Sequence, residues 1–294
     1  MATNYRSIAR GYRFSTAWHG RLPAHAGPLP KPATRRRTRG APPQAYERLE
    51  KDMARVTGMF GKLGPQFPVE IRDFTEYETV PLAAPPPTVY WEKNVSTWPM
   101  DGNDQYGDCT MAAAAHALQS WNAQTSEDLP VPTEQQVIDQ YLQLSGGEDT
   151  GLVESNVLKT WQDGGLWGNR VVAYAPVNVH DLTAIRQTIA LFGAVYAGIQ
   201  VPANAQQQFR DGKPWTLDPG WQEQPIEGGH AIPLLGYDAD YVYAITWGAV
   251  QPIAWDWWST YSDEAWAILS EEYEEKGVVN GIDIATLKED LQKV

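Results

Sequence analysis

Hydrophobic positions divide the chain into an irregular first third and a regularly patterned remainder. From residue 101 onward, apolar side chains recur at helical spacing or in short runs bounded by turn residues. This pattern predicts helices over 109–124, from Glu134 after the capping residue Thr133, over 154–164 and over 181–192. It predicts strands over 194–201, 231–237 and 241–247. Later segments, 254–266, 263–273 and 282–292, read as helical, and the first helix is apolar on most sides, which indicates a buried central element.

The first 98 residues lack such a pattern. Residues 1–45 are rich in Pro, Gly, Arg and Ala, which is typical of an extended arm with little to bury. One short helix is predicted over 44–60, and prolines then favour an extended connector up to about residue 98. We therefore expect three parts, an extended arm over 1–98, a compact α+β domain over 99–275 and an acidic helical tail over 276–294.

Composition excludes several protein classes. The chain has 294 residues and one cysteine, so it is long enough for a sizeable core and has no intramolecular disulfide. No apolar run reaches about 18 residues, and the N-terminus lacks the apolar stretch of a signal peptide. We expect no membrane partner and a cytoplasmic location, or a virion location for a phage protein. The scattered histidines and single cysteine predict neither a metal site nor a cofactor.

Charge is unevenly distributed. Residues 1–75 hold 14 basic and 5 acidic residues, a net charge of +9, whereas residues 76–294 hold 9 basic and 31 acidic residues, a net charge of −22. The arm includes the basic run Arg35, Arg36, Arg37 and Arg39, which is either a solvated linker or a contact for nucleic acid or another acidic surface. A basic arm thus precedes an acidic body.

Cys109 and His230 are the candidate reactive pair. A lone cysteine is usually a small core residue, but Cys109 begins the predicted buried helix, where the helix dipole favours the thiolate. A thiolate nucleophile needs an imidazole partner. His230 follows Gly228-Gly229 at the start of an apolar strand, where a substrate can approach closely.

These motifs resemble the papain-like cysteine peptidase superfamily over about residues 100–270. The motif Asn103-Asp-Gln105-Tyr-Gly107-Asp108-Cys109 before a buried helix is similar to the family's cysteine motif. Gly229-His230-Ala-Ile-Pro-Leu-Leu-Gly-Tyr matches its histidine motif, and Thr246-Trp247-Gly248 stands where the family has a later Trp-Gly strand end. The resemblance implies a two-lobed α+β fold, with a helical lobe that bears the cysteine and an antiparallel sheet lobe that bears the histidine.

The resemblance also implies roles for individual residues. Cys109 is the expected nucleophile, with its backbone N–H in the oxyanion hole, and His230 is the expected general base. The amide that completes the oxyanion hole is Asn103 by spacing or Gln105 by residue type. Gly107, Asp108, Gly229 and Trp247 are expected to support the site, with Trp247 shielding the histidine from solvent.

Two features depart from the family pattern. The asparagine that orients the histidine is absent, which leaves Thr246 as the candidate orienting residue, with Asp238 and Asp240 as alternatives. The segment after Trp247-Gly248 contains Trp255, Trp257 and Trp258, and it reads as a helical turn that packs under the tail rather than as a glycine-rich loop. This departure is more similar to the bacterial or phage double-glycine-peptidase branch.

The sequence leaves function hypotheses of different classes open. The first is a cysteine peptidase or amidase that hydrolyses a polypeptide or amide by acyl transfer through Cys109. The second is a catalytically weak papain-like structural module, attached by residues 1–98 to a homo- or hetero-oligomeric assembly such as a phage virion. In a third version the arm is a propeptide that covers the cleft and is cut within 60–100.

Overall fold

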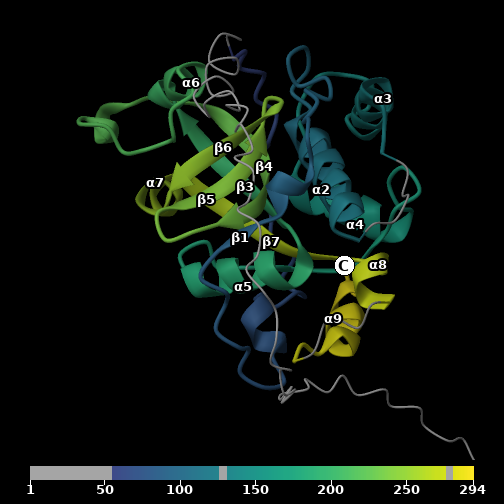
Figure 1. Cartoon of the computed structure of the whole chain (residues 1–294). Helices are drawn as coiled ribbons and strands as arrows, with labels where there is room; N and C mark the ends of the chain where they lie inside the picture. Colours follow the sequence, from purple (N-terminus) through teal and green to yellow (C-terminus); the bar gives the residue numbers. More distant parts are fainter. Residues whose placement is uncertain (1–54, 126–130, 276–280) are drawn as a thin grey trace, which may run out of the picture. The chain divides into compact units, whose positions relative to one another are not determined.

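The computed structural model describes residues 55–125, 131–275 and 281–294, all within one compact unit, Glu47–Val294 (Figure 1). Its α-helices are α2 (Cys109–Thr125), α3 (Glu134–Leu144), α4 (Glu154–Asp163), α5 (Leu182–Phe192), α6 (Ala203–Arg210), α7 (Trp255–Tyr261), α8 (Glu271–Glu275) and α9 (Ile284–Leu291). Its strands are β1 (Val89–Tyr90), β2 (Val171–Pro176), β3 (Val195–Pro202), β4 (Ile226–Tyr237), β5 (Tyr241–Thr246), β6 (Ala249–Ala254) and β7 (Ser262–Ser270). Short 3₁₀ turns lie at Phe74–Tyr77, Trp91–Asn94 and Trp221–Glu223. None of the helices in these ranges is long and apolar enough to cross a membrane.

One antiparallel sheet organises this unit. Its strand order is β2-β7-β3-β4-β5-β6, and β1 adds to β4. The central strands β7, β3 and β4 are buried along most of their length. The helices α2, α3 and α4 lie together beside the sheet, and α2 packs against β4 (Figure 1). The class predicted from the sequence, α+β with an antiparallel sheet, is confirmed.

Local sequence signals explain where the helices begin and end. Ala112–Ala115 and the rest of the α2 core face are buried, because small side chains let this helix pack closely on several sides. Thr133 caps α3, as predicted, and the structure adds a capping box in which the Gln136 side chain takes part. Asp181 caps α5, and Gly193 ends it in the left-handed conformation that glycine adopts readily.

Several predicted elements are wrong. Residues 263–270 were expected to be helical, yet they form most of β7, a strand buried between β2 and β3. The run Ala265–Leu269 is apolar on every side, and such a run fits a fully buried strand as well as a buried helix. Residues 55–60 of the helix predicted over 44–60 are not helical, and its residues 44–54 lie outside the described ranges.

The segment predicted to be a helical turn over 254–266 is helical in part. Residues Trp255–Tyr261 form helix α7 and residues from Ser262 onward belong to β7, and Trp257 and Trp258 are fully buried. Trp257 stacks on Trp215 with ring centroids 4.8 Å apart, so the tryptophans act in packing. Helix α9 falls within the predicted segment 282–292. The limits of the predicted arm, domain and tail stay predictions, although residues 55–98 supply β1 to the sheet.

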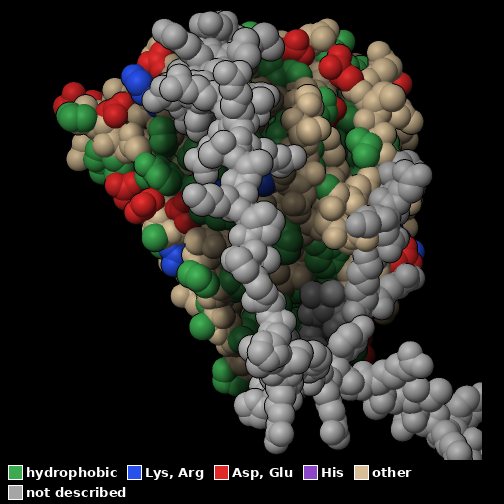
Figure 2. Space-filling model, in the orientation of Figure 1, with side chains coloured by type: hydrophobic (Ala, Val, Ile, Leu, Met, Phe, Trp, Pro, Cys, Tyr) green, Lys and Arg blue, Asp and Glu red, His purple; other side chains and the backbone are tan. Residues whose placement is uncertain are grey.

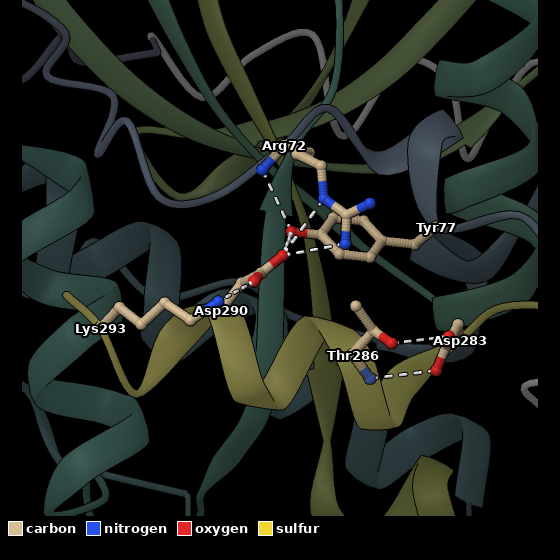
Figure 3. A network of polar contacts seen from close by, with 6 residues as sticks. All are labelled: Arg72, Tyr77, Asp283, Thr286, Asp290 and Lys293. Atoms are coloured by element: carbon tan, nitrogen blue, oxygen red, sulfur yellow. Dashed lines mark hydrogen bonds and ion pairs between the residues drawn. The ribbon is translucent and has the colours of Figure 1, made fainter.

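A carboxylate network holds α9 against an earlier segment of the chain (Figure 3). The Asp290 carboxylate accepts hydrogen bonds from the Arg72 guanidinium at 3.0 Å and from the Tyr77 hydroxyl at 3.0 Å. Lys293 donates to the other Asp290 oxygen at 2.7 Å. The hydrogen bonds from Lys293, Arg72 and Tyr77 lower the pKa of Asp290 from 3.8 to about 2. Asp290 therefore links residues 72–77 to the C-terminal helix.

We expect Asp290→Asn to loosen α9. The neutral amide loses the charge-assisted bonds to Arg72 and Lys293, so α9 amides should exchange hydrogen faster than in the wild-type protein. Because the folded-state pKa is depressed, the contribution of Asp290 is fully present above pH 4 and is lost as pH falls towards about 2. Glu289→Gln, an exposed neighbour on the same helix, is the matched control. Equal exchange in both variants would contradict the assignment.

Candidate active site

Cys109 is the first residue of α2 and is 1% exposed. Its thiol faces the backbone N–H groups of Ala231, on β4, and of Gly61. Burial dominates over these two donors and raises the pKa of the thiol from 9.0 to about 12. In this structure Cys109 is therefore a protonated thiol, although it lies at the helix N-terminus as the sequence predicted.

His230 lies on β4 immediately before Ala231, whose backbone N–H faces the Cys109 thiol. Its Nε2 atom lies 2.7 Å from Thr246 Oγ1, near the end of β5. Burial lowers the pKa of His230 from 6.5 to about 3, so the ring is neutral. The other ring nitrogen, Nδ1, has no hydrogen-bond partner within the described part of the chain, and so no hydrogen bond joins it to Cys109.

Thr246 occupies the position at which the sequence analysis expected a substitute for the orienting asparagine. The alternatives are placed elsewhere: the Asp238 carboxylate accepts hydrogen bonds from Tyr90 and Tyr243, and Asp240 is exposed. Thr246 is 2% exposed and holds the Nε2 side of the imidazole, which leaves Nδ1 as the nitrogen available for chemistry. Its role as an orienting residue remains a proposal.

Trp247 forms the wall behind the histidine. The two-residue turn Trp247-Gly248 joins β5 to β6 with φ values of 45° and 70°. Positive φ at both positions is typical of the type I′ hairpin turn, which explains the glycine. The Trp247 ring centroid lies 5.0 Å from that of His230, and Trp247 is 5% exposed. This geometry fits the predicted shielding of His230.

Asn103 and Gln105, the two oxyanion-hole candidates, have different surroundings. Asn103 is 2% exposed, and its Nδ2 atom donates to the carbonyl oxygens of Met59 and Tyr106, each at 3.1 Å. Gln105 is exposed. Of the two candidates, Asn103 is the buried one and contacts the segment around Met59, and its role in the oxyanion hole stays a proposal.

Residues Gly58–Leu63, here called the cleft segment, cross this site. On the helical side, Met59 N–H donates to Asn103 O at 2.6 Å, Leu152 N–H donates to Gly61 O at 2.9 Å, and Leu63 N–H donates to Leu152 O at 2.9 Å. On the strand side, Lys62 N–H donates to the carbonyl of Gly229, next to His230, at 3.2 Å. The cleft segment is thus bound through its backbone to both walls around Cys109.

Glycines on both sides make this close approach feasible. A Cβ on Gly61 would overlap the backbone of Gly107, and one on Gly229 would overlap the carbonyl of Lys62. Gly151 likewise faces the Gly61 carbonyl, and a Cβ on Gly107 would lie 2.8 Å from Phe60 O. The sequence had marked Gly107 and Gly229 as supporting residues, and in the structure they make room for a peptide backbone.

Side chains of the cleft segment complete the closure. The Phe60 ring packs edge-on against His230, with centroids 5.9 Å apart, and lies 6.1 Å from Trp247.

The loop before Cys109 is also buried and fixed. Asp108, which precedes Cys109, is fully buried, and burial raises the pKa of its carboxyl from 3.8 to about 8. Gly107 N–H donates to Asp149 Oδ1 at 2.9 Å, which fixes the loop before the cysteine. Cys109 and His230 are consequently enclosed by protein.

The cleft segment is not predicted from the sequence, because residues up to 98 resemble an extended arm in composition. One signal was present: Gly58, Gly61 and Gly64 recur every third residue in a stretch of low regularity. Such spacing is consistent with an extended backbone that approaches other backbone closely.

The basic run Arg35–Arg39 lies outside the described residues. Among residues 55–125, 131–275 and 281–294 no cluster of His, Cys, Asp or Glu is arranged to hold a metal ion.

Comparison with solved structures identifies the fold. Xylellain, a cysteine protease from Xylella fastidiosa, is similar over 73% of this chain and 97% of its own, with 15% identity and a TM-score of 0.56. Digestive procathepsin L 3 of Tenebrio molitor larval midgut is more distant, with 14% identity over 76% of this chain and 78% of its own and a TM-score of 0.46. No family model and no curated protein matches the sequence. The likeness to xylellain confirms the predicted papain-like fold.

The first prediction from this geometry concerns the cleft segment. Gly61→Ala introduces a methyl group where the Gly107 backbone lies, so we expect the segment to leave the cleft and the thiol to rehydrate. At pH 7.5 the single cysteine should then react with iodoacetamide roughly 10²–10³-fold faster than in the wild-type protein, as the pKa returns towards its ordinary value. Mass spectrometry of the intact chain measures the reaction.

Gly64→Ala is the matched control for this prediction. A Cβ at Gly64 has no neighbour within 4 Å, so this variant should retain the slow labelling of the wild-type protein. Equal labelling rates in Gly61→Ala, Gly64→Ala and wild type would show that the cleft segment does not shield Cys109.

The second prediction concerns Thr246. Thr246→Val keeps the shape of the side chain but leaves the buried Nε2 of His230 without its hydrogen bond. We expect the free energy of unfolding in urea to fall by about 1–3 kcal/mol, the usual cost of an unsatisfied buried polar group. Thr260→Val, which removes an exposed hydroxyl on α7, should change it by less than about 0.5 kcal/mol. Equal losses in the two variants would count against the contact.

Proposed function

We propose that this chain is a cysteine peptidase or amidase that acts by acyl transfer at Cys109. The observation that carries the proposal is that an extended peptide already lies across Cys109, bound through its backbone to Gly229 and Leu152. A cleft that accepts one peptide backbone through main-chain hydrogen bonds suits a polypeptide substrate. The fold shared with xylellain, described as a cysteine protease, supports the same substrate class.

The proposed reaction assigns one role to each residue. Cys109 transfers its proton to His230, and the thiolate attacks the carbonyl carbon of the scissile amide. The backbone N–H of Cys109 and the Asn103 side chain, which now donates to the Met59 carbonyl, stabilise the oxyanion. His230 then gives its proton to the leaving amine. Water, activated by His230, hydrolyses the thioester and regenerates the thiol.

The present conformation corresponds to a closed form in this proposal. The pKa of Cys109 is raised to about 12 and that of His230 is lowered to about 3, so proton transfer between them is unfavourable. Both shifts come mainly from burial, and the cleft segment contributes to that burial. Displacement of the segment therefore has to precede catalysis, as in the hypothesis that residues 1–98 include a propeptide cut within 60–100.

A second candidate function is a catalytically weak structural module of an assembly. The specific observation in its favour is that Nδ1 of His230 lacks a hydrogen-bond partner among the described residues, so thiol and imidazole are not paired in this form. In this reading the arm 1–98 is a tether, as in a virion component, and the cleft segment stays in place permanently.

A finer placement in the double-glycine-peptidase branch rests on helix α7 after Trp247-Gly248 and is likewise a proposal.

Hydrolysis by the opened protein tests the proposal. We expect Gly61→Ala to cleave a fluorescent casein substrate, and the double variant Gly61→Ala with Cys109→Ala to have no activity above background. His230→Gln in the same background should reduce kcat/KM by roughly 10²–10⁴-fold, the usual contribution of general acid–base catalysis. Circular dichroism establishes that each variant folds.

The structural-module reading predicts a different result. There, Gly61→Ala gains thiol reactivity without any hydrolysis that depends on Cys109. Cleavage that persists after Cys109→Ala would also refute the proposed function, because it would come from another site or another protein.

A further inference from the structure

Lys62 of the cleft segment places a cation inside the molecule. Its side chain is fully buried, and its Nζ atom lies 2.8 Å from Glu264 Oε1 and 3.0 Å from Asp263 Oδ1. Burial alone lowers the pKa of Lys62, but the charges of Glu154, Glu264 and Asp263 outweigh burial and leave it above 10.5. Lys62 is therefore an ammonium ion in an acidic pocket.

A third carboxyl group, that of Glu154, interacts electrostatically with Lys62 but lies outside ion-pair distance of it. Glu154, the first residue of α4, is fully buried, and neither of its carboxyl oxygens has a hydrogen-bond partner in the described ranges. Burial, and next the charge of Glu264, raise the pKa of Glu154 well above its usual value, so Glu154 is a neutral carboxylic acid beside the Lys62 ion pairs. Two carboxylates thus pair with one buried cation, and the carboxyl group of Glu154 lies near them.

The walls of the pocket are shaped and fixed. Gly198 on β3 pairs with Glu264 on β7, and a Cβ at Gly198 would overlap Cε of Lys62. The missing side chain is what makes room for the lysine stem. Trp266 Nε1 donates to Glu264 Oε2 at 3.0 Å, and Gln200 donates to Asp263. These donors orient the two carboxylates before any cation arrives, which is the arrangement of a preorganised binding site.

Fold stability alone does not account for this arrangement. Burying an ion pair costs desolvation that its attraction often fails to recover, and apolar residues of similar size are frequently as stabilising. Here the carboxyl groups outnumber the cation, and the cation belongs to the segment that blocks the cleft rather than to the walls. When the cleft segment leaves, the carboxyl groups lose their cation, so the open cleft has a site for another one.

We propose that this pocket, formed by Glu154, Asp263, Glu264 and Gly198, selects substrates with a lysine or arginine side chain. The proposal rests on the proposed function and names its substrate class. The basic residue of the substrate takes the place of Lys62, whose backbone N–H bonds to Gly229 beside His230 and whose neighbour Gly61 faces the Cys109 thiol. The selected side chain therefore lies close to the bond that is cleaved.

Matched substrates in the Gly61→Ala background test this selection. The peptides of a library carry lysine, arginine or norleucine at one varied position. Norleucine has an unbranched aliphatic side chain like the stem of lysine but carries no charge. We expect kcat/KM for the best lysine or arginine peptide to exceed that of its norleucine counterpart by roughly 10–100-fold, as one buried charge-assisted contact supplies. A ratio near one at every position overturns the proposal.

Substitution of the pocket assigns the selection to these carboxylates. Glu264→Gln keeps the size of the side chain and removes its charge, so the ratio of basic to norleucine peptide should fall about tenfold or more. Asp211→Asn is the matched control, because Asp211 pairs with Lys213 at 2.9 Å on the exposed surface and should leave the ratio unchanged. An unchanged ratio in Glu264→Gln overturns the assignment.

A second variant covers the case in which Glu264→Gln does not fold. Asp263 keeps 18% of its side chain exposed, so Asp263→Asn is better tolerated and should lower the ratio in the same direction. Failure of this proposal is distinguishable from failure of the proposed function. If Cys109-dependent cleavage is present without basic selectivity, only the pocket assignment is wrong, whereas no cleavage of any peptide refutes the peptidase itself.

Discussion

Two stretches of peptide backbone can touch directly only where the residues at the point of contact carry no side chain in the way. That constraint governs the centre of this molecule, because the cleft segment Gly58–Leu63 meets glycine on both sides. Gly61 contacts Gly107 just before Cys109, and Lys62 contacts Gly229 just before His230. The loop before the helix and the start of the strand thereby contact the same short peptide, one on each side of the candidate site.

The same contact sets the acid–base state of the site. Water excluded by the cleft segment no longer stabilises a thiolate or an imidazolium, so Cys109 and His230 both stay neutral. The Lys62 side chain meanwhile neutralises part of the charge of the acidic pocket beneath it. Displacement of the six-residue cleft segment therefore does two things at once. It exposes the Cys109 thiol to water, and it removes Lys62 from the acidic pocket.

The parts of this structure that sequence predicts are those encoded locally. Cys109 at a helix start and His230 on a strand follow from periodicity and flanking glycines, and Thr246 was identified by its place before Trp247-Gly248. The pairing of Lys62 with Asp263 and Glu264 joins residues about 200 positions apart, and no local pattern encodes it. Strand β7 was mistaken for a helix because a short apolar run that is buried on all sides has no distinguishing period.

Strand β1, which follows the cleft segment in the chain, attaches to the sheet independently of it. Val89 and Tyr90 pair with Tyr237 and Gly236 on β4, the strand that also carries His230. A backbone cut between residues 64 and 88 would leave each side of the break bound to the body by its own contacts. The cleft segment would then be a separate chain without a tether, and its departure would depend on dilution and on the lifetime of its contacts. Cutting and opening are in this respect distinct events, with different dependence on protein concentration.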